Sequence, residues 1–212
     1  VLSQRKLHQQ LAPPRFAAAH RYLDLYFDAG TPLAAALDRL CAEAEDAARD
    51  GIELLILTDR RPRRGAAPVH ALLATGAVHL HLVRAGLRCA VNLIVETGTA
   101  RDAHHIACLV GYGATAVYPY LAYQTLHDLG VRGILKTKHG EMTQIGRSYR
   151  RGVKKGLLKI ISKMGISTIG SYRGARLFEI VGLDREVVEL CFAGTPSRIG
   201  GAGFAELQAD AG

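Results

Sequence analysis

Residues 52–57 read IELLIL, an unbroken apolar run with a single acid. Such a run is typical of a β-strand that is buried on both faces. Residues 32–50 (PLAAALDRLCAEAEDAARD) precede it and predict a helix, because Thr31 can cap the first turn and a proline at the first helical position loses no hydrogen bond. Gly51 would end this helix, so the chain passes from a helix into a buried strand.

The same alternation continues along the chain. The pattern predicts a helix from Pro68 to about Gly86, a strand at 91–95, a helix at 100–110 opened by a capping box of Thr99 and Asp102, and a strand at 114–117. Parallel neighbouring strands need a crossover helix, so this spacing predicts an α/β fold with parallel β/α units. The pattern alone leaves a barrel and an open doubly wound sheet as alternatives.

The C-terminal part of the chain has a different character. Residues 131–148 are polar and rich in glycine, which predicts a connecting loop, and residues 149–164 predict a helix. After this helix, residues 165–168 predict a short strand and Ser171 the cap of a further helix. Residues 194–207 (GTPSRIGGAGFAEL) predict a loop.

Charge divides the chain at about the same point. The formal net charge is +8, and residues 1–130 hold thirteen Lys and Arg against twelve Asp and Glu. Residues 131–212 hold fourteen against seven. This contrast predicts a domain boundary near Gly130, with a helical connecting region after it.

Composition restricts the class of protein. The chain is 49% hydrophobic and 22% charged, as in globular proteins. It has no apolar run near the roughly 20 residues that a membrane-spanning helix needs, and VLSQRKLHQQLAPPRF at its start lacks the apolar core of a signal peptide. We therefore expect a cytoplasmic protein without a membrane partner.

Polar side chains follow each predicted strand, where β/α proteins build their sites. They are Thr58, Asp59, Arg60, Glu96, Thr97, Tyr118 and Tyr120. An acid, a base and phenols on one edge would suit a carboxylate or amide ligand. The alternative is that these groups pair with each other or cap the next helix, as strand-end residues commonly do.

A basic stripe recurs every four residues along the predicted helix at 149–164 and the residues just before it. It consists of Arg147, Arg151, Lys155, Lys159 and Lys163. Nucleic acid or a membrane surface could bind such a stripe, but no aromatic residues interleave to stack on bases. We therefore expect a protein interface, with Lys155 and Lys159 at its centre.

The spacing of the cysteine and histidine residues does not predict a metal site. Cys41, Cys89, Cys108 and Cys191 are far apart, which predicts buried free thiols. His104 and Cys108 are spaced i, i+4, but two ligands are too few to enclose a metal ion.

Three stretches carry a family resemblance. They are residues 95–121 (VETGTARDAHHIACLVGYGATAVYPYL), residues 160–183 (IISKMGISTIGSYRGARLFEIVGL) and, more loosely, residues 54–88. Together they resemble the central domain of the large subunit of glutamate synthase and its junction with the flavin-binding domain.

The resemblance implies a partial TIM-barrel-like central domain in residues 1–130, and in residues 131–212 a basic linker that leads to the FMN-binding domain. The family transfers ammonia from glutamine to 2-oxoglutarate and reduces the product to glutamate with a flavin, so FMN and an iron-sulfur cluster are implied for the full-length enzyme. For this segment the resemblance implies a scaffolding role without catalytic or cofactor-binding residues of its own. Its partners would be the remaining domains of the subunit, with a reductase subunit or ferredoxin as electron donor.

Two further expectations concern Arg173 and the role of the chain as a whole. Arg173 would stand in the first turn of the helix capped by Ser171, where the helix dipole disfavours a cation, so it predicts a partner carboxylate or a ligand. The alternative to the glutamate synthase interpretation is a stand-alone β/α binding module that docks an acidic protein through the basic helix.

Overall fold

The computed structural model describes residues 1–135 and 142–211. Its centre is a parallel sheet in the order β1 (His20–Asp24), β3 (Leu54–Thr58), β5 (Asn92–Glu96), β6 (Ala116–Tyr118). Within this sheet, each strand neighbours the next one along the chain, and the order does not reverse. A doubly wound sheet reverses at a switch point, whereas a barrel wall does not. The predicted α/β class with parallel β/α units is confirmed, and the strand order is that of part of a barrel wall.

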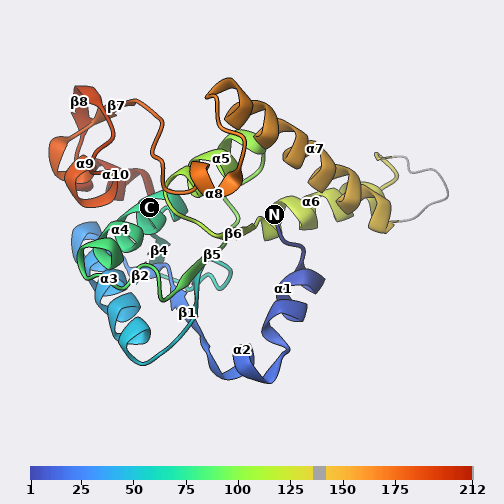
Figure 1. Cartoon of the computed structure of the whole chain (residues 1–212), viewed down its shortest axis with the longest axis horizontal. Coiled ribbons are helices and arrows are strands. Elements are labelled where there is room, and N and C mark those ends of the chain that lie inside the picture. Colours follow the sequence, from blue (N-terminus) through green and yellow to red (C-terminus); the bar gives the residue numbers. More distant parts are fainter. Residues whose placement is uncertain (136–141, 212) are drawn as a thin grey trace.

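Three helices cover one face of this sheet (Figure 1). They are α3 (Leu33–Arg49), α4 (Ala71–Arg84) and α5 (Ala103–Gly111), and they contact β1, β3, β5 and β6 in turn. Alternate residues of the strands, such as Leu55 and Leu93, enter a large apolar core with these helices. This arrangement follows from period-two strands that are apolar on both faces.

The other face of the sheet is covered by α1 (Gln4–Leu11), which α2 (Pro14–Ala18) joins to β1. Leu7 of α1 is buried against Ile56, Ile94 and Tyr118 in a second apolar cluster. This cover is partial, because Tyr22 of β1 is 47% exposed. Two short strands, β2 (Tyr26–Asp28) and β4 (Ala66–Pro68), form a separate antiparallel ribbon.

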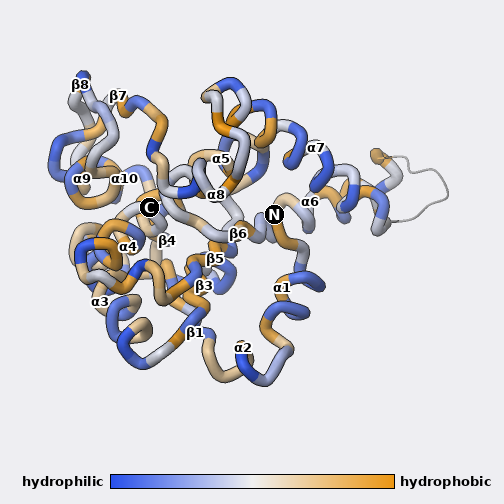
Figure 2. Tube along the Cα trace, viewed as in Figure 1, coloured by the Kyte–Doolittle hydropathy of each residue, from blue (hydrophilic) through white to orange (hydrophobic). Residues whose placement is uncertain are grey.

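The C-terminal elements pack back onto the β/α units. α7 (Met142–Lys163) packs on α5 and on α6 (Tyr120–Val131); after α8 (Ile169–Tyr172), α9 (Arg185–Cys191) packs on α4, and α10 (Phe204–Ala211) packs on α3. The strands β7 (Ile180–Leu183) and β8 (Ser197–Ala202) form a parallel pair. Figure 2 shows hydrophilic and hydrophobic residues alternating along α7, as expected for a helix with one buried face. Within the described residues, no helix has the length and apolar character needed to cross a membrane.

The core runs without interruption across the predicted boundary near Gly130. Val153 and Leu157 of α7 belong to the same buried cluster as Ile106 of α5. Gly130 itself lies inside α6. The division into residues 1–130 and 131–212 therefore stays a prediction.

The strand predicted at 165–168 and the helix predicted to start at Ser171 are wrong. The chain there forms the four-residue helix α8, capped by Thr168, and Arg173 is its C-cap. Tertiary contacts hold this segment in place: Tyr172 is fully buried, and its hydroxyl donates to the Ala107 carbonyl at 3.0 Å. The Gly174 N–H donates to the Val110 carbonyl at 3.1 Å. Because Arg173 does not stand in a first helical turn, the reason for expecting a carboxylate beside it disappears.

Three predicted helix starts lie too early. α3 begins at Leu33, whose N–H is bound by the Gln208 side chain of α10 at 2.8 Å and not by Thr31. Pro68 belongs to β4, and His70 caps α4. In α5 the cap is Asp102 itself, which accepts from two backbone N–H groups.

The predicted loops are also shorter than expected. α6 reaches Val131 and α7 begins at Met142, so much of residues 131–148 is helical; residues 136–141 lie outside the described part. Residues 194–207 include all of β8 and the start of α10 instead of a loop. β8 forms because Ser197 and Ile199 find partners in β7, a pairing that local sequence does not reveal.

Burial of the cysteines was predicted correctly for two of them. Cys41 and Cys191 are buried, Cys108 is half-buried and Cys89 is exposed. Cys89 lies in the turn after α4, outside the helices and strands that form the core.

A half-buried polar network behind α4 predicts a pH dependence of stability. Arg88 donates from Nε to His79 Nδ1 at 2.9 Å and caps the Val91 and Gly113 carbonyls at 2.7 Å each. Burial, and then the charge of Arg88, lower the pKa of His79 to about 4. In the unfolded chain its pKa is about 6.5, so the unfolded state takes up the proton first as the pH falls.

We therefore expect His79 to lower the stability of the fold as the pH falls from about 6.5 to about 4. In His79→Gln this part of the pH dependence should be absent, because the amide oxygen can still accept from Arg88 without titrating. Urea unfolding followed by circular dichroism across this range tests it, with the exposed His127→Gln as control. Parallel pH profiles for parent and His79→Gln would contradict the prediction.

Candidate functional site

One row of side chains crosses the carboxyl end of the sheet. The strand register places Asp24, Thr58, Glu96 and Tyr118 side by side on β1, β3, β5 and β6. All four share one face, because residues that are register partners on neighbouring strands point to the same side of the sheet. Asp24 is half-buried and the other three are buried. This edge is where β/α proteins place their chemistry.

Glu96 is the centre of this row. Its side chain is 6% exposed, and its carboxylate accepts from the Thr58 hydroxyl at 2.7 Å and from the Arg60 guanidinium at 3.1 Å. The guanidinium also lies over the rings of Tyr118 and Tyr120, with centroid distances of 5.7 and 5.5 Å. Arg60 and Glu96 therefore neutralise each other, and two phenol rings hold the arginine in place.

Asp59 points into a different network. Its carboxylate accepts from the Thr97 hydroxyl and from the Gly98 N–H, the latter at 2.9 Å. The Tyr120 hydroxyl donates to the Asp59 backbone carbonyl at 3.2 Å. Burial, and then the charge of Asp59, raise the pKa of Tyr120, so this phenol stays protonated at neutral pH. The structure thus does not bring Asp59 and Glu96 to one point.

The chemistry available at this edge is limited. Glu96 is neutralised by Arg60, and burial raises the pKa of Tyr118 and Tyr120, so these phenols stay protonated at neutral pH. In the part of the chain that the structure describes, no group of three or more His, Cys, Asp or Glu side chains could hold a metal ion. The contacts are those of strand-end groups that pair with each other.

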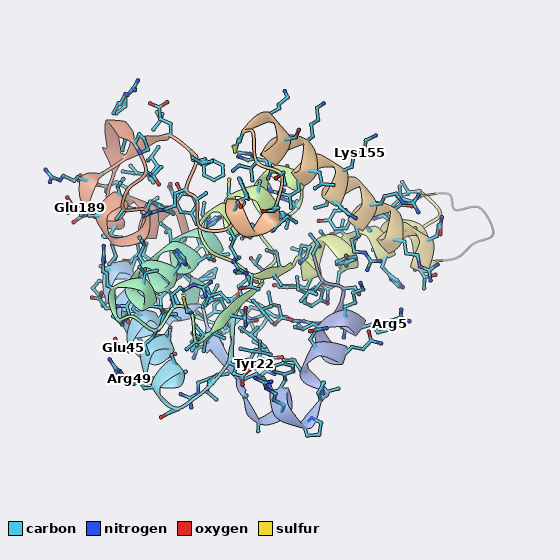
Figure 3. All side chains as sticks on the ribbon, in the orientation of Figure 1. Arg5, Tyr22, Glu45, Arg49, Lys155 and Glu189 are labelled. Carbon is cyan, nitrogen blue, oxygen red and sulfur yellow. The ribbon has the colours of Figure 1, made fainter. Side chains whose placement is uncertain are left out.

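The remaining predicted site residues lie away from this edge. Lys155 and Lys159 are exposed on α7, and Lys155 points away from the body of the molecule (Figure 3). The stripe residues Arg147, Arg151 and Lys163 are exposed as well. None of the five forms an ion pair with an acid among the described residues.

The sequence profile of the glutamate synthase central domain matches residues 1–184. The chain belongs to the glutamate synthase central domain family. It is 40% identical over 210 residues to glutamate synthase [NADH] of Saccharomyces cerevisiae, which covers 95% of this chain and 10% of that protein. It is 43% identical over 175 residues to the glutamate synthase [NADPH] large chain of Bacillus subtilis, covering 82% of this chain and 11% of that one.

A ferredoxin-dependent, chloroplastic glutamate synthase of Oryza sativa is 44% identical over 202 residues, covering 88% of this chain and 12% of that protein. This member of the glutamate synthase central domain family therefore spans only about a tenth of the length of these curated relatives. Among solved structures, a flavocytochrome b2 variant with benzoylformate aligns with a TM-score of 0.50 at 13% identity, over 76% of this chain and 40% of that one. At this identity the likeness concerns the fold alone.

Two residues on the face of the strand-end row, Tyr22 and Asp24, are not predicted by the sequence pattern because it does not reveal β1. HRYLD at residues 20–24 alternates polar and apolar residues, but it is short and follows a segment rich in alanine and proline. Alternation of His20, Tyr22 and Asp24 on one face is the available signal. This signal would place Tyr22 and Asp24 on the same face as Thr58 and Glu96.

Proposed function

We propose that this chain is a segment of a glutamate synthase large chain and acts there mainly as a scaffold. The observation that carries the proposal is the internal neutralisation of the strand-end site, since Arg60 and Glu96 satisfy each other within a fold of this family. A large chain of the family would form glutamate from glutamine, 2-oxoglutarate and a reductant. This segment would hold the ammonia-producing and flavin domains in their relative positions.

Cofactors and electron donor belong to the same proposal. FMN and an iron-sulfur cluster are expected in the full-length enzyme, but the separated cysteines of this chain do not fit the ligand set of a cluster. The relatives are named for NADH, NADPH and ferredoxin, so their names support no choice of donor. Some relatives are named chloroplastic, and a cytoplasmic location stays a prediction.

The basic stripe of α7 is the surface through which we expect the scaffold to act. Its five exposed cations lie opposite the buried face that packs on α5 and α6. An acidic surface of a neighbouring domain of the same subunit is the occupant that this charge favours. Docking of an acidic protein by a stand-alone module is the second candidate function, supported by the same stripe.

The test is the double variant Lys155→Glu/Lys159→Glu in the full-length large chain. We expect a clear fall in the ratio of glutamate formed to glutamine hydrolysed, because reversed charge would separate the domains. Arg5→Glu/Lys6→Glu on the exposed side of α1 makes the same change in net charge and should leave the ratio unchanged.

Nucleic-acid binding by the 212-residue chain is measured alongside. Binding that persists at physiological salt and is lost in Lys155→Glu/Lys159→Glu, together with an unchanged ratio, would refute the scaffold. A lowered ratio of glutamate formed to glutamine hydrolysed in both double variants would show a general charge effect. That result would equally remove the stripe from the proposal.

A further inference from the structure

A pocket of about 390 Å³ lies beside the strand-end row. Its walls come from the loop after β3, the amino ends of α3 and α4, the loop after β5, and the C-terminal elements through α10. This volume is within the range of small-molecule sites. Most of the lining is apolar, including Leu33, Leu73 and Phe192, and among the residues that the structure describes no lysine or arginine lines it.

Asp59 is the buried acid of this pocket. It is 6% exposed, and its carboxylate accepts hydrogen bonds from neutral groups, the Thr97 hydroxyl and the Gly98 N–H. The Thr99 N–H donates to the Thr97 oxygen at 3.1 Å, which orients the Thr97 proton toward Asp59. Among the described residues no cation forms an ion pair with Asp59, since the neighbouring Arg60 is committed to Glu96. A buried carboxylate without a cation is costly, and a cationic ligand would relieve that cost.

Helix amino ends do not make this an anion site. Two of them border the pocket, and helix amino ends attract anions when their N–H groups are free. At α3 the Leu33 N–H is already bound by Gln208, and at α4 the Leu72 N–H donates to His70 Nδ1 at 3.3 Å. Asp210 adds a second acid to the lining.

We propose that this pocket binds a small aliphatic primary amine in its ammonium form, with the ammonium on Asp59 and the carbon chain against Leu73, Phe192 and Leu207. An ammonium ion donates three hydrogen bonds and matches a carboxylate that has acceptor capacity left. The apolar walls gain by covering the carbon chain. The proposal goes beyond the scaffold function and does not depend on it.

The test is a titration of the 212-residue chain with n-butylammonium, followed by ¹H–¹⁵N NMR. We expect saturable shifts at the amides of Gly98, Leu72 and Leu207, and clearly weaker binding of n-butanol, which has the same carbon chain without the charge. Asp59→Asn should weaken n-butylammonium binding about tenfold or more, because a charge-assisted bond is lost. Asp128→Asn, a change of the same kind at an exposed acid on α6, should leave binding unchanged.

A second variant keeps the test decisive if Asp59→Asn does not fold. Ala211 is exposed and lines the pocket, so Ala211→Phe should fill the space without disturbing the bonds of Asp59, and binding should disappear. Equal binding of n-butanol and n-butylammonium, unchanged binding in either pocket variant, or no saturable shift would each overturn the proposal. Every arm reads binding to this chain alone, so the outcome is independent of any glutamate synthase activity.

Discussion

Gly76→Ala is expected to destabilise the fold by about 3 kcal/mol, the upper end of what overpacking a core costs. Gly76 lies where α4 meets α9, and a Cβ there would overlap the backbone carbonyl oxygen of Cys191 and lie 3.2 Å from Phe192 Cε1. A backbone oxygen cannot turn aside as a flexible side chain can. The two helices would have to separate, and the apolar contacts between them would be lost.

Gly152→Ala is the matched control for this change. Gly152 also lies within a helix, but a Cβ there would meet nothing within 4 Å. Alanine should therefore stabilise α7 by up to about 1 kcal/mol through helix propensity. Urea unfolding monitored by circular dichroism measures both variants. A Gly76→Ala protein as stable as the parent would show that α4 and α9 do not approach each other this closely.

Arg60→Met is the second change with a large expected effect. It removes the cation from Glu96, whose side chain is 6% exposed, and leaves a buried carboxylate with the Thr58 hydroxyl as its remaining partner. Breaking a buried pair in this way costs about 3 kcal/mol. The double variant Arg60→Met/Glu96→Gln should recover most of that loss, because the amide carries no charge and can still accept from Thr58.

Arg15→Met is the control for the strand-end pair. Arg15 is also bonded to a glutamate, Glu53 at 2.8 Å, but its side chain is 72% exposed. Exposed pairs contribute about 1 kcal/mol or less. Thermal unfolding of the parent, Arg60→Met, Arg60→Met/Glu96→Gln and Arg15→Met measures these losses of stability. Equal losses in Arg60→Met and Arg15→Met, or no recovery in the double variant, would contradict a buried and mutually dependent pair.

For the strand-end row, local sequence patterns predict the positions of the residues but not their partners. Strand ends are recognisable from apolar runs, so the amino-acid sequence is enough to place Asp59, Arg60 and Glu96 near one edge of the sheet. Local patterns do not predict which of these residues pair. The bond from Arg60 to Glu96 spans two strands, and Asp59 turns instead toward Thr97 and Gly98 after β5.

The sequence by itself determined the α/β class, the alternation of helices with three of the four sheet strands, and the family. These depend on short-range periodicity and on ordered motifs, which each segment carries alone. Only the tertiary structure decided the strand β1, the pairing of β7 with β8, the conformation of α8 and the capping of α3 by Gln208. In each of these, partners distant along the chain supply the hydrogen bonds and the burial, so local propensity is overridden by contacts that exist only once the chain has folded.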